Sequence, residues 1–347
     1  MPNKKFKTGN SEIDQRILEL AELFAPSESY EALRLEILTT VAKFFLEHND
    51  LGEHKLINTT LKELRHAFRV FNSYRDIRKV VIFGSTRSPT SDPCYKLAYE
   101  LSKIIANEGM MVITGAGGGI MEAANKGAGK INSFGINIKL PCEQKPNPFI
   151  DDDPKLMEFK YFFTRKLILI KESDATVLLP GGLGTLDEGF ENLTLFQTGK
   201  SSPRPIILLE PKNGNYWNTW MDWVKSVLVN NKFISPDDVH LFQLKHSSKE
   251  AYRAIHDFYR VYHSLRYCKG LTVLRFTQSI SKKIIDRLNV EFQDIITEGT
   301  IYSSPPLKGE VQSHDKTLKM PRLIFKFDKQ SFGRLNQMIR NINEWVG

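Results

Sequence analysis

The sequence predicts an α/β fold, in which a parallel sheet is covered by helices on both faces. A helical N-terminal extension and a small α+β C-terminal appendage flank this sheet. From residue 79 onward, strand-like and helix-like segments alternate five times, which is the order of elements in parallel α/β proteins. The strand-like segments are apolar throughout rather than alternating, which is typical of strands that are buried on both faces.

The N-terminal region, residues 1–77, is expected to be helical. Apolar residues recur at helical spacing within residues 12–48, and a further helix is expected in residues 60–74. No glycine occurs between Gly9 and Gly52, in keeping with a helical region.

The central region, residues 78–265, is expected to hold the parallel sheet. Strands are predicted in KVVIFGS, MMVITGAGGG, SFGINIKLP, ATVLLPGG and RPIILLEP. Helices are predicted between them in YKLAYELSKIIANEG, IMEAANKGAGK, KLMEFKYFFTRKLILIKES and TLDEGFENLTLFQTG. Two further helices, residues 216–231 and 248–265, are expected to close this region near residue 265.

The C-terminal region, residues 266–347, predicts a small α+β domain. Its expected elements are strands at 270–276, 294–302 and 322–328, helices at 279–292 and 331–346, and a polar loop at 303–321. The region holds 14 Lys and Arg against 8 Asp and Glu, within a chain of formal net charge +8. This basic excess is either a solvated face or an attraction for an anionic partner, such as a nucleotide effector or a nucleic acid.

The composition bounds the class of protein. With 41% hydrophobic and 25% charged residues, the 347-residue chain resembles an ordinary soluble globular protein. Its three cysteines, Cys94, Cys142 and Cys268, are far apart, which argues against a disulfide framework or a structural zinc site. No secretory signal is visible, and no apolar run approaches the roughly 18 residues of a membrane span. We therefore expect a cytoplasmic protein without a membrane segment.

Three glycine turns follow predicted strands: Gly84-Ser85, Gly115 to Gly119, and Gly181 to Gly184. In an open parallel sheet, ligands bind outside the carboxyl ends of the strands. Glycine lets the backbone approach a ligand closely, and a helix N-terminus offers unpaired N–H groups, so such turns suit a phosphate. The pattern G-x-G-x-x-G and the G-K-[ST] of a Walker A loop are both absent. This favours a mononucleotide or sugar phosphate over a dinucleotide.

The stretch LPGGLGTLDEGFE carries the candidate acid Glu188. Thr185 to Glu188 fits the capping box S/T-x-x-E, in which both side chains only satisfy backbone N–H groups. Alternatively, Thr185 offers its hydroxyl to a phosphate, and Glu188 acts on the anomeric carbon of a bound phosphosugar. Arg165 in FFTRKLILI is the natural partner of Glu188, although a surface position or a structural salt bridge would explain it equally.

Three sequence blocks carry a family resemblance. TGAGGGIMEAANKGA, FTRK and PGGLGTLDE occur in this order, and the last reads as P-G-G-x-G-T-x-x-E. Together they resemble the LOG family, phosphoribohydrolases often mislabelled as lysine decarboxylases, over about residues 78–230. The flanking regions resemble, in layout, the longer nucleotide nucleosidases of this family rather than its minimal plant-type members.

The resemblance implies a Rossmann-like fold and a usually dimeric enzyme. Such enzymes hydrolyse the N-glycosidic bond of nucleoside 5′-monophosphates to a free base and ribose 5-phosphate. The matching catalytic residues are Arg165 and Glu188. The matching substrate- and phosphate-binding residues are Ser85, Gly117, Gly118, Gly119, Gly182, Gly184 and Thr185.

The chain also departs from the family pattern. Ala116 replaces a glycine in the second turn, the proline usual in that turn is missing, and Phe162 replaces a methionine three residues before Arg165. These departures bear on the preferred base more than on the chemistry. Neither a cofactor nor a metal is expected, because the eight histidines are scattered without metal-ligand spacing.

Three alternatives compete with hydrolysis. Molybdenum-cofactor carriers share the glycine loops without needing the pair Arg165 and Glu188, whose presence favours an enzyme. Amino-acid decarboxylation would need pyridoxal phosphate on a lysine, and no lysine here has a recognisable cofactor context. Nucleic-acid binding through the basic C-terminal region would show as salt-sensitive affinity. The general acid for the leaving base is Asp187, a residue of a second subunit, or absent.

Overall fold

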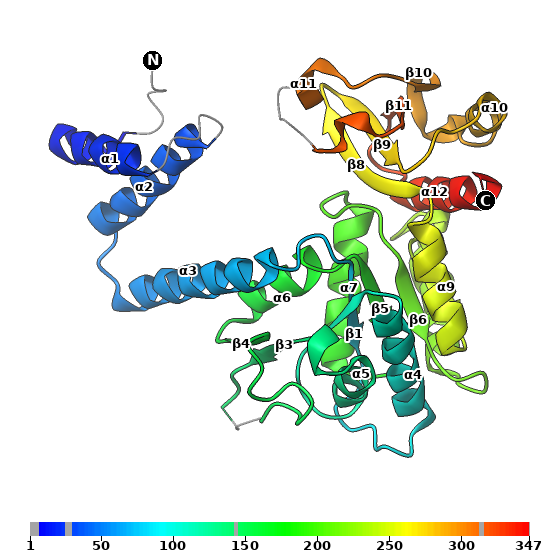
Figure 1. Ribbon diagram of the computed structural model, residues 1–347. Helices are drawn as coiled ribbons and strands as arrows, with labels where there is room; N and C mark the ends of the chain where they lie inside the picture. The colour runs from blue at the N-terminus through cyan, green and yellow to red at the C-terminus, as the bar shows by residue number, and fades with distance from the viewer. Residues whose placement is uncertain (1–6, 25–29, 142–144, 312–315, 347) are drawn as a thin grey trace. The chain divides into compact units, whose positions relative to one another are not determined.

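A computed structural model describes residues 7–24, 30–141, 145–311 and 316–346 (Figure 1). The chain divides into two compact units, Met1–Glu63 and Leu64–Gly347. The first unit holds α1 (Ser11–Leu23), α2 (Glu31–Glu47) and the start of α3 (Leu51–Asn72). The Asn10 side chain begins α1 by accepting hydrogen bonds from the N–H groups of Glu12 and Ile13, a typical N-cap.

The second unit is built on a seven-stranded parallel sheet of order β4-β3-β2-β1-β5-β6-β7. Its strands are β1 (Lys79–Phe83), β2 (Met111–Thr114), β3 (Ser133–Ile138), β4 (Leu156–Phe159), β5 (Ala175–Leu178), β6 (Ile206–Leu209) and β7 (Gln243–Lys245). The chain starts in the centre at β1, builds outward through β2 to β4, and then crosses to β5 on the other side. This is a doubly wound, Rossmann-like topology, as the sequence predicts.

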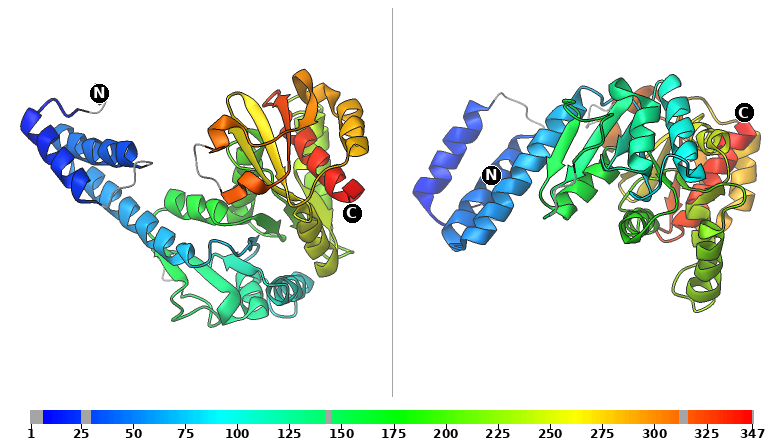
Figure 2. Two further views of the ribbon diagram at one scale, coloured as in Figure 1. Left: turned by 45° about the horizontal axis from the view of Figure 1, so that its top comes forward. Right: turned by 90° about the horizontal axis from the view of Figure 1, so that it is seen from below.

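Helices cover both faces of this sheet (Figure 1 and Figure 2). Val80 and Ile82 of β1 pack toward α4 (Pro93–Asn107), α5 (Ile120–Ala128) and α9 (Ser248–Phe258). Val81 and Phe83 belong to the other core, which includes residues of α6 (Phe162–Lys171), α7 (Leu183–Gln197) and α8 (Tyr216–Trp223). Because successive strand residues point to opposite faces, both faces of β1 need apolar residues, and its run is apolar throughout.

The predicted helix over residues 155–173 is wrong in its first half. Leu156–Phe159 forms the edge strand β4, and α6 begins only at Phe162. The pairing of β4 with β3 explains the difference: the buried residues Met157 and Phe159 alternate with more exposed ones. A short apolar run is compatible with a strand or with a helix. Here the segment forms a strand because it can pair with the exposed edge of β3.

Two other helix predictions also need correction. Residues 248–265 do not form one helix, because α9 ends at Phe258 and strand β8 (Tyr262–Cys268) follows. Residues 216–231 begin as α8 and continue as a π-helical segment, Val224–Val229. The short strand β7 and the 3-10 segment η3 (Pro236–Leu241) before it are not predicted from the sequence.

The C-terminal part is built on an antiparallel sheet of order β10-β11-β9-β8. Its remaining elements are β9 (Leu271–Phe276), α10 (Lys282–Glu291), β10 (Ile296–Ser303), β11 (Arg322–Phe327) and α12 (Phe332–Val346). The predicted polar loop contains a short helix, α11 (Lys308–Val311), and a 3-10 turn, Lys316–Lys319; its residues 312–315 lie outside the described residues. Cys142, one of the three cysteines, also lies outside the described residues.

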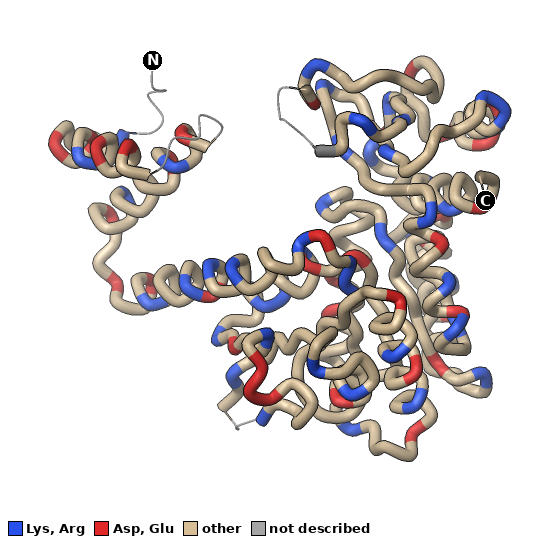
Figure 3. Tube along the Cα trace, viewed as in Figure 1, with Lys and Arg blue, Asp and Glu red and all other residues tan. Residues whose placement is uncertain are grey.

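Part of the basic excess of this region is internal. Glu310 is fully buried and pairs with Arg275 Nη2 at 2.7 Å and with Arg322 Nη1 at 2.8 Å. Arg322 also donates from Nη2 to the carbonyl oxygen of Met320 at 2.8 Å. The other Lys and Arg residues are spread over several elements rather than gathered on one (Figure 3). A single solvated basic face therefore does not account for the whole surplus.

None of the helices in the described ranges is both long and apolar enough to cross a membrane.

The close packing of α5 against α4 supports a stability prediction. A Cβ on Gly127 of α5 would lie 2.1 Å from the carbonyl oxygen of Tyr99 in α4. Gly127→Ala should therefore force the two helices apart and lower the free energy of unfolding by about 1–3 kcal/mol. Gly184→Ala is the control, because a Cβ there meets nothing within 4 Å and should change stability by less than about 0.5 kcal/mol. Urea unfolding of both variants checks this, and equal midpoints would contradict the packing argument.

Candidate active site

The three glycine turns meet at the carboxyl edge of the sheet. The sheet order places β1 between β2 and β5, so the turns that follow these strands are neighbours. The Ser85 N–H donates to the carbonyl oxygen of Pro180 at 3.1 Å, and the Ser85 carbonyl oxygen accepts from the Ile120 N–H at 3.0 Å. Ser85 thus ties the β1 turn to both of the others.

Glycine is needed where these turns approach one another. A Cβ on Gly181 would lie 2.2 Å from Thr185 Oγ1 and 3.0 Å from the Ser85 nitrogen. Gly119 has a φ of +60°, and its Cβ would lie 2.4 Å from the Ser85 carbonyl oxygen. Both positions therefore exclude any side chain, for reasons of space and, at Gly119, of backbone conformation.

A pocket of about 580 Å³ opens at this edge. Six of the nine site residues expected from the sequence line it: Ser85, Arg165, Gly182, Gly184, Thr185 and Glu188. The other three, Gly117, Gly118 and Gly119, are not among its lining residues. A Cβ on Gly118 would face the Thr86 carbonyl oxygen at 3.6 Å, and the Gly117 carbonyl oxygen accepts from Asn147 Nδ2 at 3.0 Å. The role of these three glycines in phosphate binding stays a prediction.

The capping-box interpretation of Thr185 and Glu188 is wrong. Helix α7 begins at Leu183 with Gly182 as its N-cap, and no side chain caps it. Because the helix starts three residues earlier than the capping box requires, Thr185 lies in its first turn and Glu188 in its second. Neither side chain is needed to satisfy the helix end, and both are buried at the pocket wall.

Arg165 and Glu188 face each other in the pocket. Arg165 Nη1 lies 3.7 Å from Glu188 Oε1, and the two side chains are only 11% and 6% exposed. Arg165 Nε donates to the carbonyl oxygen of Ile136 at 2.9 Å, which fixes the guanidinium. A Cβ on Gly115 would lie 2.5 Å from Arg165 Nη2, so the absence of a side chain at this position makes room for the guanidinium.

The environment of Glu188 is unusual for a carboxylate. Burial raises its pKa to about 7, although the nearby charges of Arg165 and Lys166 work in the opposite direction. Its second oxygen, Oε2, is buried without a hydrogen-bond partner among the described residues. Burial also lowers the pKa of Arg165. A strongly shifted pKa in a pocket is typical of functional residues, and a buried oxygen without a partner is available to a ligand.

Lys166 forms ion pairs with two acidic residues of α7 that lie near Arg165 and Glu188. Its Nζ lies 2.8 Å from Asp187 Oδ2 and 2.8 Å from Glu191 Oε2. Asp187, the candidate general acid, lines the pocket with an exposed carboxyl group. Glu191 is absent from the lining of this pocket.

The sequence analysis did not single out several lining residues. Asn137 is buried at the end of β3, while Thr86, Arg87 and Met121 flank the first two glycine turns. Asn137 carries a recognisable signal, because it is a polar residue near the carboxyl end of an apolar strand. Phe162, which sequence analysis connects with base preference, also lines the pocket and is exposed. Among the described residues, no group of three or more His, Cys, Asp or Glu side chains could hold a metal ion.

Comparisons with known proteins find relatives of the central part of this chain. The model of a family described as possible lysine decarboxylase matches residues 118–255. The chain is 28% identical over 169 residues to a cytokinin riboside 5′-monophosphate phosphoribohydrolase of Mycobacterium tuberculosis, covering 48% of this chain and 88% of that protein. It is 35% identical over 94 residues to the Arabidopsis thaliana cytokinin riboside 5′-monophosphate phosphoribohydrolase LOG1, covering 27% of this chain and 42% of that protein.

Solved structures give a weaker likeness. The molybdenum cofactor binding protein from Rippkaea orientalis is 24% identical, covers 52% of this chain and 94% of its own, and has a TM-score of 0.36. The molybdenum cofactor carrier protein from Chlamydomonas reinhardtii is 21% identical, covers 52% and 96%, and has a TM-score of 0.37. Such scores add nothing to the fold described above. The family match and the curated relatives, however, confirm that the central part of this chain resembles the LOG family, as its motifs predict.

Proposed function

We propose that this protein hydrolyses the N-glycosidic bond of nucleoside 5′-monophosphates, releasing a free base and ribose 5-phosphate. The observation that carries the proposal is the buried carboxyl group of Glu188, which faces Arg165 in the pocket and has one oxygen without a hydrogen-bond partner in the described part of the chain. The printed activity of the relatives, on cytokinin riboside 5′-monophosphates, belongs to the same reaction class.

The glycine turns supply the anchor for the substrate phosphate. Gly182 and Gly184 lie at the N-terminal end of α7, where backbone N–H groups and the helix dipole favour an anion. Thr185 adds a hydroxyl group at the pocket wall. Anchoring the 5′-phosphate fixes the ribose relative to Glu188, so that binding energy far from the reacting carbon orients the reaction.

Glu188 acts on the ribosyl carbon. As the bond from C1′ to the base nitrogen breaks, its electron pair leaves with the base, and positive charge develops on the ribose, as in glycoside hydrolysis. The Glu188 carboxylate stabilises this charge or orients the water whose oxygen forms the new bond to C1′. The base gains one proton, and the water loses one. Arg165 positions Glu188, the ribose or both. The proton donor to the base is Asp187, a residue of a second subunit, or absent.

Removing the negative charge of Glu188 tests this role. Glu188→Gln preserves the size of the side chain and should lower kcat for release of free base by at least about 100-fold. Glu191→Gln, one turn further along α7 and outside the pocket lining, is the matched control and should retain most of the activity. Chromatography of the products from a panel of nucleoside 5′-monophosphates measures both variants and names the preferred base. Tight binding of a monophosphate without release of base would favour a binding protein instead.

The raised pKa of Glu188 predicts a pH dependence. Since the carboxylate is the active form, kcat/KM should rise as the pH increases through about 7 and level off above it. The stability should change in the opposite sense, because the folded protein binds one more proton than the unfolded chain between pH 4.5 and about 7. The Glu188 contribution to stability is therefore greatest at low pH and lost as the pH rises through about 7. A pH-independent kcat/KM between pH 5 and 8 would contradict the assignment.

We also propose that the active form is a dimer or a higher oligomer. Phe163 and Leu167, one turn apart on α6, are 53% and 49% exposed, which supports a contact between subunits through this helix.

A charge on this face of α6 tests the oligomer. Leu167→Glu should shift the protein toward the monomer in size-exclusion chromatography with light scattering, because a carboxylate would be buried in the contact. Ile131→Glu is the control, since Ile131 is 82% exposed on a different element. A monomeric wild-type protein, or a dimer unaffected by Leu167→Glu, would refute the proposed contact.

A further inference from the structure

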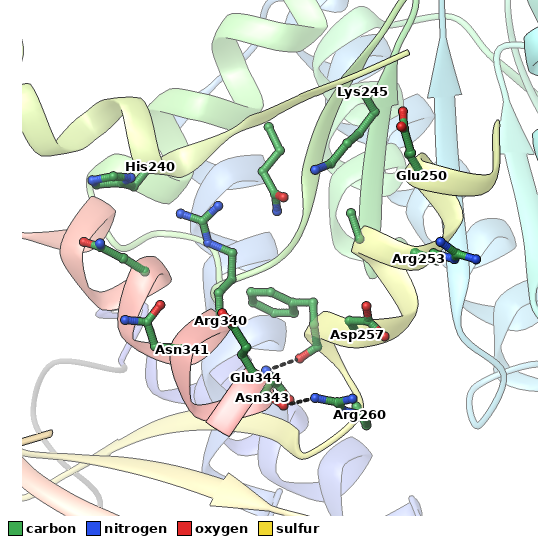
Figure 4. Close-up of a pocket in the computed structure, with 14 residues that line it drawn as sticks. His240, Lys245, Glu250, Arg253, Asp257, Arg260, Arg340, Asn341, Asn343 and Glu344 are labelled. Carbon is green, nitrogen blue, oxygen red and sulfur yellow. Dashed lines mark hydrogen bonds between the residues drawn. The ribbon is translucent and has the colours of Figure 1, made fainter. Parts of the chain in front are cut away.

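A second pocket, of about 750 Å³, lies where the C-terminal part joins the parallel sheet (Figure 4). Its walls come from α12 on one side and from α9, β7 and η3 on the other. It shares no lining residue with the candidate active site. Nothing in the proposed hydrolysis uses it.

Several basic side chains line this pocket: His240, Lys245, Arg253, Arg260 and Arg340. Figure 4 shows the ends of Arg340 and Lys245 turned toward the same space, with His240 at its side. The three residues come from α12, β7 and η3, so the fold brings them together from distant parts of the sequence. Burial and the nearby Arg340 guanidinium both lower the pKa of His240, which agrees with this closeness.

Arg340 is the most informative of these side chains. It is partly buried, and its Nε is buried without a hydrogen-bond partner among the described residues. Burial lowers its pKa, and no carboxylate opposes this effect. A guanidinium withdrawn from water without a partner is costly, and an anion in the pocket would offset this cost with a charge-assisted hydrogen bond.

The acidic residues of the pocket offset these cations only in part. Glu250, Asp257 and Glu344 also line it, and the His246 N–H, the Ser247 side chain and the charge of Lys245 all lower the pKa of Glu250. Glu250 accepts from the His246 N–H at 3.1 Å, and Asp257 pairs with His256. Arg340, whose Nε has no hydrogen-bond partner among the described residues, is therefore the cation best placed to meet a ligand.

The two walls are firmly joined. Asn336 Nδ2 of α12 donates to the His240 carbonyl oxygen at 2.8 Å. Asn343 Oδ1 accepts from the N–H groups of Val261 and Tyr262 at 2.8 and 3.1 Å. These buried asparagines hold α12 against η3 and against the start of β8, so the pocket is formed before any ligand arrives, which lowers the entropic cost of binding.

From this geometry we infer that the pocket between α12 and α9 binds a phosphate-bearing small molecule of about nucleotide size. Arginine offers planar paired donors that match phosphate oxygens, and Lys245 adds a point charge. The volume exceeds what a single phosphate needs and lies in the usual range for small-molecule sites, about 300–1,000 Å³. The site is independent of the proposed hydrolysis and concerns binding alone.

Isothermal titration calorimetry on the full-length protein tests the site, with inorganic pyrophosphate and ATP as probes. Wild-type protein should bind at least one of them, and Arg340→Gln and Lys245→Gln should each weaken that binding at least 10-fold. Lys249→Gln, an exposed charge on α9 outside the lining, is the matched control and should bind like the wild type. Circular dichroism checks the fold, and Lys245→Gln keeps the test valid if Arg340→Gln does not fold. Tighter binding of ATP than of pyrophosphate would show that the nucleoside contributes.

The opposite results are equally clear. No binding of either probe up to millimolar concentration would overturn the inference. So would binding that Arg340→Gln and Lys245→Gln leave unchanged while Thr185→Val abolishes it, because the probes would then occupy the candidate active site only.

Discussion

The desolvation of one carboxyl group, that of Glu188, is the constraint on which the candidate site depends. A carboxylate in this position is stable only if a cation is close, and Arg165 meets this need at 3.7 Å without forming a tight pair. The result is a side chain held near the midpoint of its titration at neutral pH. Such a group can accept a new partner without first breaking a strong bond, which a surface glutamate in a tight salt bridge could not do.

The sheet topology makes this arrangement possible. Because the chain begins at the central strand and builds outward on both sides, three turns from distant sequence positions share one edge. Ser85 joins the other two turns through its backbone, and Gly181 and Gly119 allow the close packing. The site therefore rests on backbone geometry, with Arg165 and Glu188 supplied by two successive helices, α6 and α7.

Much of this could be predicted from the sequence, and the failures have physical causes. The apolar runs that end in glycine identify β1, β2 and β5, because buried parallel strands need apolar residues on both faces. The edge strand β4 cannot be predicted from its own residues, because Leu156–Phe159 forms a strand only by pairing with β3. The start of α7 was misplaced, because Gly182 replaces a side-chain cap. The pocket lined by Arg340 and Lys245 cannot be recognised from any short stretch of the sequence. Its lining residues lie far apart in the chain and meet only in the folded structure.

The short distance between Gly115 and the Arg165 guanidinium has a consequence for comparing related chains. A Cβ at position 115 would lie 2.5 Å from Arg165 Nη2 and 2.7 Å from Met121 Sδ, so a side chain there would displace the end of one or both of these side chains. A relative with a bulky residue there that turned its arginine away would leave the acid opposite it without a cation. Position 115 therefore offers a simple marker, readable from sequence alone, that separates chains able to seat the charged pair from chains that keep only the glycine-lined cradle.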